Sequence, residues 1–446
     1  MKTILIIGAG LSSSTLIKYL LEHSEEHDWQ IRIADKSEQT AKQKTEGHPR
    51  ATAIAFDIFN EQQANEEIKQ SNIVVSMLPA RFHHIVAEKC ITYEKYMVTA
   101  SYVSDEIKEL ESEAQKKGLL FLNEIGVDPG IDHMSAMQII DRIKDKGGKI
   151  TAFKSFTGGL VAPKYDNNPW NYKFTWNQRN VVLAGQGSSA QYIENNKLKF
   201  IPYNRLFKNT FRTNIEGYGE FEGYPNRDSL KYRPIYKLEN VPTLLRGTLR
   251  RPGYSRAWDA FVQLGMTDDS FTIKNCNQMT YREFTESFLP EDEALSTEAK
   301  TAKLLGFNPE GERMYKLRWL GLFDDITIEL EKGSPAEILQ EILAKKWVLD
   351  KDDKDMIAMQ HIFEYELQGQ KKRLTSSMAI EGDDTVHTAM SKTVGLPAAI
   401  AVKMILTGVI NLTGVVVPIL PEIYEPVLKE LKTHGVKFVE KEENMA

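Results

Sequence analysis

Short apolar runs alternate with longer segments of helical period along the first 130 residues. The segments between these runs repeat apolar residues at helical spacing. Buried strands that alternate with helices are typical of a parallel α/β sheet with helices on both faces. We therefore predict a six-stranded, doubly wound parallel sheet. The expected strands are 3–7, 31–34, 51–56, 73–77, 96–99 and 118–122, and the expected helices are 12–22, 61–70, 82–94 and 104–117.

The first predicted strand runs into a glycine turn. Gly8 permits a tight bend, and Gly10 lets the backbone approach a pyrophosphate whose charge meets the N-terminus of the next helix. Ser13 occupies the third position of this fingerprint, where glycine is more usual. The alternative is an ordinary strand-to-helix turn. We expect a Rossmann dinucleotide site whose pyrophosphate is held by Gly8, Ala9, Gly10, Leu11, Ser12 and Ser13.

The preference between NAD and NADP depends on Asp35, at the end of the second strand. Its carboxylate can accept hydrogen bonds from ribose hydroxyls and would repel a 2′-phosphate, which favours NAD. The neighbouring Lys36, with Lys42 and Lys44 close in sequence, would reduce that repulsion. We expect NAD or NADP as cofactor, with a preference for NAD.

Residues that follow the strands are expected to share one edge of the sheet, because ligands bind beyond the carboxyl ends of parallel strands. For each of them the alternative is an ordinary polar loop residue. The predicted polar members of this edge are Asp57, Ser76, Ser101, Tyr102 and Asp128. The full set of further cofactor contacts that we expect here is Asp35, Lys36, Asp57, Ile58, Ser76, Leu78, Ala100, Ser101, Val127 and Asp128.

The pattern changes beyond residue 130. Residues 151–290 are rich in Thr, Tyr, Phe, Trp and Gly with strand-like runs, 291–360 are charged and mostly helical, and 388–406 form an apolar helix pattern. We predict a dinucleotide-binding domain at 1–130, completed by about 388–446. A second α/β domain is expected at 131–387, with a helical subdomain at about 291–360.

Composition and charge exclude several classes of protein. Of the 446 residues, 41% are hydrophobic and 26% charged, and the formal charge of -6 is spread without the basic stripe that nucleic-acid binding requires. Cys90 and Cys276 lack the spacing of a disulfide framework or of a metal site. No apolar run reaches the roughly 18 residues of a membrane span. We expect a cytoplasmic protein without a metal, membrane or nucleic-acid partner.

Several motifs together resemble one family. They are Thr99-Ala-Ser-Tyr102, Gly126-Val-Asp-Pro-Gly-Ile-Asp-His133, Asn168-Pro-Trp-Asn-Tyr-Lys-Phe-Thr-Trp176, Tyr224-Pro-Asn-Arg-Asp-Ser229 and Leu245-Arg-Gly-Thr-Leu-Arg250. The chain resembles, over nearly its whole length, the saccharopine reductase family of glutamate-forming saccharopine dehydrogenases. The resemblance implies a Rossmann domain, an α/β substrate and dimerisation domain, a small helical domain, NAD(P)-linked chemistry on saccharopine in lysine metabolism, and a homodimer.

The implied substrate carries three carboxylates, which call for guanidinium groups because a planar fork binds a carboxylate through two hydrogen bonds. Arg227 and Arg246 are the leading candidates, and an ion pair with Asp228 is the structural alternative for Arg227. Asp128 and Tyr102 are candidates for catalytic proton transfer. The substrate contacts implied by the resemblance are Ser101, Tyr102, Asp128, Trp176, Arg227, Arg246, Gly247 and Thr248.

Three histidines lie near these motifs. His83 and His84 fall on the expected nicotinamide side, where one of them could contact the cofactor. His133 follows Asp132 at an expected helix start, where a capping or core role is favoured over catalysis.

Two other functions remain as alternatives. Enzymes that make carboxynorspermidine resemble this family in fold and imine chemistry, so the chain could be an imine reductase of polyamine synthesis. A non-catalytic dinucleotide-binding sensor is the other alternative, and it would need neither Arg227 nor Arg246. The motifs do not specify whether saccharopine is made or oxidised.

Overall fold

The chain forms two compact units in a computed structural model that describes residues 1–445. The first unit consists of residues 1–150, 366–371 and 380–439, and the second of residues 151–365, 372–379 and 440 onward. The segment that follows residue 380 therefore returns to the unit that the N-terminus begins.

The first unit extends to residue 150, whereas the sequence predicted a boundary after residue 130. The reason is α7 (Ile131–Asp145), which packs against α17 (Pro421–Thr433) of the same unit. Across this contact the Tyr424 hydroxyl donates to the Asp141 carboxylate over 2.8 Å. The loop that precedes α7 is therefore anchored within the first unit.

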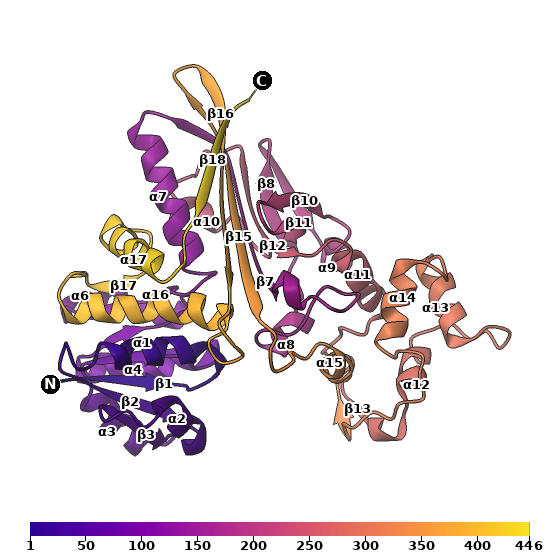
Figure 1. Cartoon of the computed structure of the whole chain (residues 1–446), viewed down its shortest axis with the longest axis horizontal. Helices are drawn as coiled ribbons and strands as arrows, with labels where there is room; N and C mark the ends of the chain where they lie inside the picture. Colours follow the sequence, from indigo (N-terminus) through magenta and orange to yellow (C-terminus); the bar gives the residue numbers. More distant parts are fainter. Residues whose placement is uncertain (446) are drawn as a thin grey trace. The chain divides into compact units, whose positions relative to one another are not determined.

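A seven-stranded parallel sheet forms the centre of the first unit, in the order β17-β6-β5-β4-β1-β2-β3. Figure 1 labels its strands β1, β2, β3 and β17. The predicted doubly wound sheet is confirmed, but the prediction of six strands was wrong. The missed strand β17 pairs with β6 but lies near the C-terminal end of the chain, outside the alternation of strands and helices in the first 130 residues from which the sheet was predicted. The strands are β1 (Lys2–Ile7), β2 (Trp29–Asp35), β3 (Ala51–Ala55), β4 (Ile73–Ser76), β5 (Tyr96–Val98), β6 (Leu120–Leu122) and β17 (Gly414–Val416).

Helices connect these strands, and several begin at a residue whose side chain caps them. Asn60 accepts a hydrogen bond from the backbone of Gln63 at the start of α3, and Ser104 accepts one from Ile107 at the start of α5. The expected helix at 104–117 is divided into α5 and α6 at Leu110. The helices are α1 (Ser14–Glu22), α2 (Glu38–Thr45), α3 (Glu61–Lys69), α4 (His83–Tyr93), α5 (Asp105–Glu109), α6 (Glu111–Lys116) and α16 (Ala389–Leu406), with 3₁₀ turns at Leu11–Ser13 and Ala80–Phe82.

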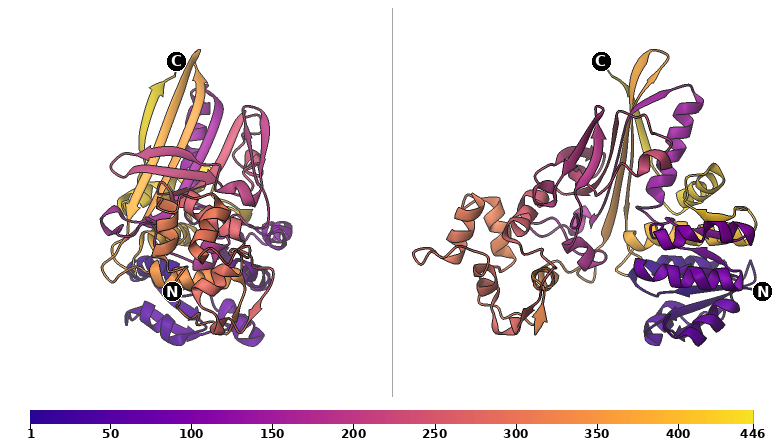
Figure 2. Two further views of the ribbon diagram at one scale, coloured as in Figure 1. Left: turned by 90° about the vertical axis from the view of Figure 1, so that its right-hand side faces the viewer. Right: turned by 180° about the vertical axis from the view of Figure 1, so that it is seen from behind.

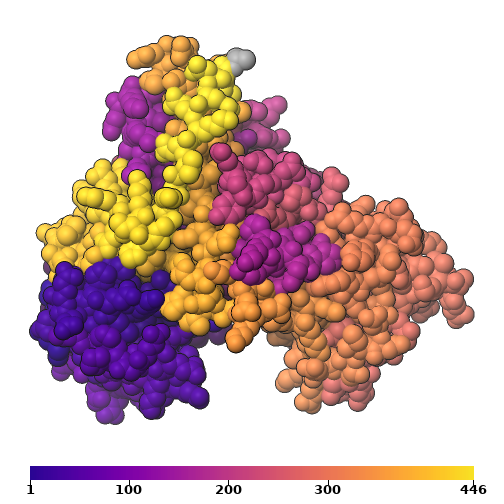
Figure 3. All heavy atoms as spheres, viewed as in Figure 1, coloured from indigo at the N-terminus to yellow at the C-terminus, as the bar shows by residue number. Residues whose placement is uncertain are grey.

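Helix α16 packs closely against α1, so that residues from the two ends of the chain lie side by side (Figure 3). A Cβ atom on Gly395 would lie 2.8 Å from the backbone nitrogen of Leu16, so only glycine fits at this contact. Ser391 accepts a hydrogen bond from the backbone nitrogen of Thr15 over 2.9 Å. Among the described residues, α16 is also the one helix long and apolar enough to span a membrane, and 78% of it is buried inside the protein.

The second unit is built on a nine-stranded mixed sheet, which Figure 2 shows from two further directions. Strand β12 pairs in parallel with β7 and antiparallel with β11. Strand β15 begins within the segment that was predicted to be helical up to residue 360. The strands are β7 (Lys149–Val161), β8 (Ala190–Glu194), β9 (Lys197–Ile201), β10 (Phe211–Ile215), β11 (Gly219–Pro225), β12 (Thr243–Arg250), β15 (Asp355–Leu367), β16 (Gln370–Glu381) and β18 (Val439–Asn444), and a separate pair is β13 (Ile273–Lys274) with β14 (Lys332–Gly333).

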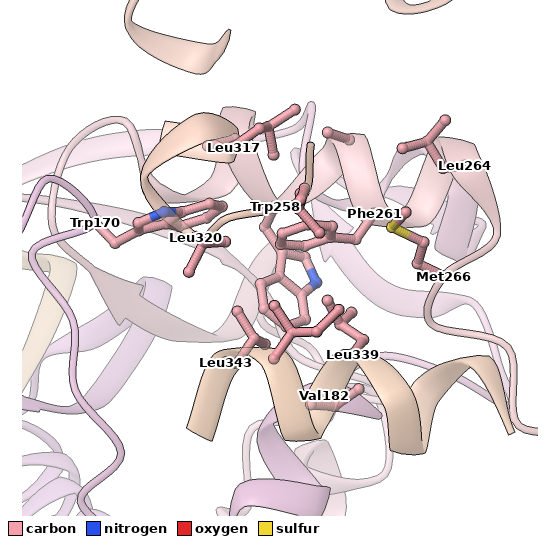
Figure 4. Packing of buried hydrophobic residues seen from close by; sticks show 14 of the residues in the cluster. Trp170, Val182, Trp258, Phe261, Leu264, Met266, Leu317, Leu320, Leu339 and Leu343 are labelled. Carbon is pink, nitrogen blue, oxygen red and sulfur yellow. The ribbon is translucent and has the colours of Figure 1, made fainter. Parts of the chain in front are cut away.

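The helices of the second unit enclose an aromatic core (Figure 4). Trp170, Trp258 and Trp347 are fully buried in it, and the rings of Trp170 and Phe261 stack with centroids 5.6 Å apart. Leu339 and Leu343 enter the same cluster from one face of α15. The helices are α8 (Gln178–Val182), α9 (Tyr203–Leu206), α10 (Tyr232–Ile235), α11 (Tyr254–Leu264), α12 (Tyr281–Glu286), α13 (Thr297–Leu305), α14 (Glu312–Trp319) and α15 (Pro335–Lys346), with 3₁₀ turns at Pro163–Tyr165 and Cys276–Gln278.

Candidate active site

The glycine turn after β1 has room for a ligand on one side only. Gly8 has a φ of +108°, and a Cβ atom there would lie 2.8 Å from the carbonyl oxygen of Met77. Gly10 has an ordinary φ of -67°, and apart from Gly10 itself and its two chain neighbours no heavy atom of residues 1–445 lies within 4 Å of the position that its Cβ would take. Gly8 is thus required by the fold, while Gly10 opens onto free space beside the N-terminus of α1. This cradle fits a dinucleotide pyrophosphate.

The Asp35 carboxylate supports this turn from within the protein. One of its oxygens accepts a hydrogen bond from the Ala9 nitrogen over 2.8 Å, and the other accepts one from the Ser37 nitrogen over 2.9 Å. The Asp35 carboxylate therefore already accepts two backbone hydrogen bonds, which the sequence pattern did not indicate. The exposed Lys36 ammonium lies at the same edge, 3.8 Å from the Asp57 carboxylate.

His83 connects two of the predicted edge serines. Its Nδ1 lies 2.8 Å from the Ser76 hydroxyl, and its Nε2 lies 2.7 Å from the Ser101 hydroxyl. A neutral imidazole has one donor and one acceptor nitrogen, and hydroxyls satisfy both. Burial, together with the neighbouring His84, lowers the pKa of His83 to about 4. The sequence predicted both serines and named His83 or His84 as a cofactor contact, but it did not indicate that His83 links the two serines.

Tyr102 and Asp128 also meet in the first unit. The Tyr102 hydroxyl lies 3.5 Å from a carboxylate oxygen of Asp128, and the residue Tyr102 is 40% exposed. Two groups able to hold or move a proton therefore stand together beyond β5 and β6. Glu124 follows β6 and precedes the loop of Asp128. It was not predicted as a site residue, because the sequence pattern does not distinguish it from other acidic residues that follow a strand.

The predicted arginines of the second unit lie on adjacent segments. Strands β11 and β12 pair so that Pro225 faces Gly247, and the nitrogen of Asn226 donates to the Arg246 carbonyl over 2.9 Å. A Cβ atom on Gly247 would lie 2.6 Å from the Tyr224 carbonyl oxygen, so glycine is required there. This pairing places the loop of Arg227 directly beside the strand of Arg246.

The two guanidinium groups have different surroundings. Arg227 is exposed and has no carboxylate partner within residues 1–445, and the carboxylate of the neighbouring Asp228 accepts a hydrogen bond from the Leu230 nitrogen. Arg246 is buried, with its guanidinium 3.9 Å from the centre of the Tyr232 ring. An exposed guanidinium such as that of Arg227 is available to an anionic ligand. Of the other implied contacts, Thr248 is half-buried on β12 and Trp176 is half-buried against the aromatic core.

Within the described chain, no group of three or more His, Cys, Asp or Glu side chains could hold a metal ion. The first unit thus contains a glycine turn with open space beside Gly10 and a contact between Tyr102 and Asp128, and the second contains the exposed Arg227 beside the buried Arg246.

Comparison with known proteins gives a consistent result. Residues 4–122 match the saccharopine dehydrogenase NADP binding domain, and residues 126–436 match the saccharopine dehydrogenase C-terminal domain. The saccharopine dehydrogenase [NADP(+), L-glutamate-forming] of Schizosaccharomyces pombe is 31% identical over 449 residues, covering 99% of both chains. Bovine α-aminoadipic semialdehyde synthase is 33% identical over 448 residues, which cover 98% of this chain and 47% of that protein.

A solved structure agrees with these matches. The apo saccharopine dehydrogenase (L-Glu forming) of Saccharomyces cerevisiae superposes with a TM-score of 0.89 at 30% identity, over 100% of each chain. Fold and sequence therefore agree over the whole length of the chain. This chain belongs to the saccharopine dehydrogenase family.

Proposed function

We propose that this chain is an NADP-dependent saccharopine dehydrogenase that forms L-glutamate. The observation that carries the proposal is the match along 99% of both chains to an enzyme of that name. The dinucleotide cradle of the first unit and the two arginines of the second unit also support the proposal. A non-catalytic sensor would have no use for the arginines or for the Tyr102–Asp128 pair. Formation of a homodimer stays a prediction.

The reaction converts saccharopine, the oxidised cofactor and water into glutamate, 2-aminoadipate 6-semialdehyde, the reduced cofactor and a proton. The cofactor, when bound, supplies hydride exchange with the carbon next to the secondary nitrogen. Water then splits the resulting imine, and the reverse reaction joins glutamate to the aldehyde. The protein's own residues must bind three carboxylates, orient the reacting carbon and manage the amine proton.

The named side chains divide this work. Arg227, with no competing carboxylate, binds one substrate carboxylate through its guanidinium fork, and Arg246 binds a second from the neighbouring strand. Asp128 takes or orients the proton of the secondary amine, and the Tyr102 hydroxyl beside it can pass a proton to solvent. Ser101, held by His83, contributes a hydroxyl at the same edge.

We propose NADP as the cofactor, and the comparisons do not support the preference for NAD that Asp35 suggested. The Schizosaccharomyces pombe relative is named for NADP(+), and both Asp35 oxygens in this chain already accept backbone hydrogen bonds. Lys36 would then pair with the 2′-phosphate. The variant Lys36→Ala should raise KM for NADP⁺ about tenfold, as expected for a charge-assisted hydrogen bond, and leave KM for NAD⁺ within about twofold.

The test of the function is an absorbance assay at 340 nm with saccharopine and either NADP⁺ or NAD⁺. Turnover that is faster with NADP⁺ is the expected result. Turnover of carboxynorspermidine but not of saccharopine would assign the chain to the polyamine alternative. Cofactor binding without turnover of either amine would favour the sensor.

A further inference from the structure

Three buried ionisable side chains flank Asp128 along the chain. Glu124 is 6% exposed, and Asp132 and His133 are fully buried. Burying two carboxylates and an imidazole is costly unless they are hydrogen-bonded, and apolar residues would fill the same space more cheaply. The contacts of these three residues indicate what they do.

Glu124 holds the segment that carries Tyr102 at two points. Its backbone nitrogen donates to the carbonyl oxygen of Ser101 over 3.0 Å, and its Oε1 accepts a hydrogen bond from the nitrogen of Val103 over 3.1 Å. Tyr102 lies between these two points. Glu124 also has a φ of +56°, a left-handed conformation that costs free energy in a residue with a side chain. Strained residues of this kind persist where their surroundings fix them, often at functional sites.

The same carboxylate reaches the first turn of α7. Glu124 Oε2 lies 2.9 Å from the Nε2 of His133, and the Nδ1 of His133 lies 3.5 Å from Asp132 Oδ2. The other oxygen of Asp132 accepts a hydrogen bond from the Gly130 nitrogen over 2.7 Å. Gly130 closes the loop that carries Asp128.

That loop has no room to relax. The Gly126 nitrogen donates to the Pro129 carbonyl over 2.9 Å, and a Cβ atom on Gly130 would lie 2.0 Å from the Gly126 carbonyl oxygen. Asp132 thus anchors the Asp128 loop, Glu124 anchors the Tyr102 segment, and His133 joins the two anchors.

We infer that Glu124, His133 and Asp132 form a positioning network that fixes Tyr102 and Asp128 relative to each other for the chemical step. The inference rests on the proposed function for those two residues. None of the three network residues needs to touch substrate or cofactor. Misplacement of a reacting group by about 1 Å can reduce rates roughly 100-fold, so such a network affects the chemical step more than binding.

The test compares Glu124→Ala and Glu124→Gln with a matched control, Glu109→Ala. Glu109 is an exposed carboxylate on α5 that has no hydrogen bond or ion pair through its side chain within residues 1–445. Glutamine keeps an oxygen for the Val103 nitrogen and offers an amide to His133, whereas alanine loses both. We expect Glu124→Ala to lower kcat about 10- to 100-fold with cofactor Kd unchanged, Glu124→Gln to retain kcat within about threefold, and the control to match the wild type.

A deuterium isotope effect on hydride transfer separates positioning from loss of folded enzyme. A smaller active fraction lowers kcat but leaves the isotope effect unchanged, whereas a misaligned site makes hydride transfer more rate-limiting and raises the isotope effect. If Glu124→Ala does not fold, His133→Leu removes the link between the anchors and should also lower kcat and raise the isotope effect. Equal kcat in Glu124→Ala and wild type, an unchanged isotope effect, or failure of glutamine to restore kcat would overturn the inference.

Hydrogen exchange distinguishes this result from failure of the proposed function. Amides of the peptide spanning 101–105 should exchange faster in Glu124→Ala than in the control, whatever the substrate is. If the wild type does not oxidise saccharopine, the proposed function fails, and unchanged exchange in Glu124→Ala would then overturn the network by itself.

Discussion

The buried His83 should make the stability of this protein fall steeply with acidification. The pKa of His83 is lowered from 6.5 to about 4, because burial disfavours the charged imidazole and the neighbouring His84 adds to the effect. The folded state therefore binds the proton only near pH 4, whereas the unfolded chain binds it near pH 6.5. The neutral form contributes its full stability above the unfolded pKa, and this contribution is lost as the pH falls from there toward 4.

The size of the loss follows from the two pKa values of His83. Each unit of pKa difference corresponds to about 1.4 kcal/mol, so the whole shift corresponds to about 3 kcal/mol. Between pH 7 and pH 5 the expected loss is about 2 kcal/mol, a large part of the stability of an ordinary domain. A variant with a residue that does not titrate at position 83 would not lose this part of its stability on acidification.

The assay is urea unfolding of wild type and His83→Gln at pH 7, 6 and 5, followed by fluorescence and circular dichroism together. Other titrating groups, including His434 with its own lowered pKa, are present in both proteins and cancel in the difference. The wild type should lose about 2 kcal/mol more than His83→Gln between pH 7 and pH 5. Parallel loss in the two proteins would refute the buried, neutral His83 between its two serines.

Four further substitutions test the site and its support. Gly8→Ala should prevent stable folding of the first unit, because its Cβ would meet a backbone carbonyl at a positive φ, whereas Gly10→Ala should fold normally and raise the cofactor KM at least tenfold by filling the pyrophosphate space. Thermal unfolding and cofactor titration of the pair would show the contrast, and equal behaviour would contradict it. Arg227→Ala should raise KM for saccharopine roughly 10- to 100-fold without changing cofactor Kd, as expected for loss of a charge-assisted pair, and an unchanged KM would remove it from the substrate site. Gly395→Ala should lower the stability of the first unit by about 1–3 kcal/mol, because α16 must move away from α1, and an unchanged unfolding midpoint would contradict that contact.

Features that repeat locally were predictable from the sequence. The strand ends, the glycine turn and the edge residues Ser76 and Ser101 follow from periodicity and from the rule that parallel strands bring their carboxyl ends together. The structure adds that His83 bonds both serines at once, which requires knowing that β4 and β5 are neighbours.

Contacts between distant segments were not predictable. The role of Asp35 depends on its hydrogen bond to the turn at Ala9, which is not visible in a strand pattern. The importance of Glu124 depends on a left-handed backbone and on partners before and after it in the chain. The boundary at residue 150 depends on whether the apolar face of α7 finds its partner in α17, and amphipathicity alone does not name the partner.

The most direct test of the proposed reaction is its stoichiometry. Purified protein is incubated with saccharopine and NADP⁺, and glutamate, 2-aminoadipate 6-semialdehyde and NADPH are measured in the same samples over time. The three products should appear in equal amounts, and Arg227→Ala should slow the formation of all three together. NADPH formed without glutamate, or no NADPH at all, would contradict the proposed reaction.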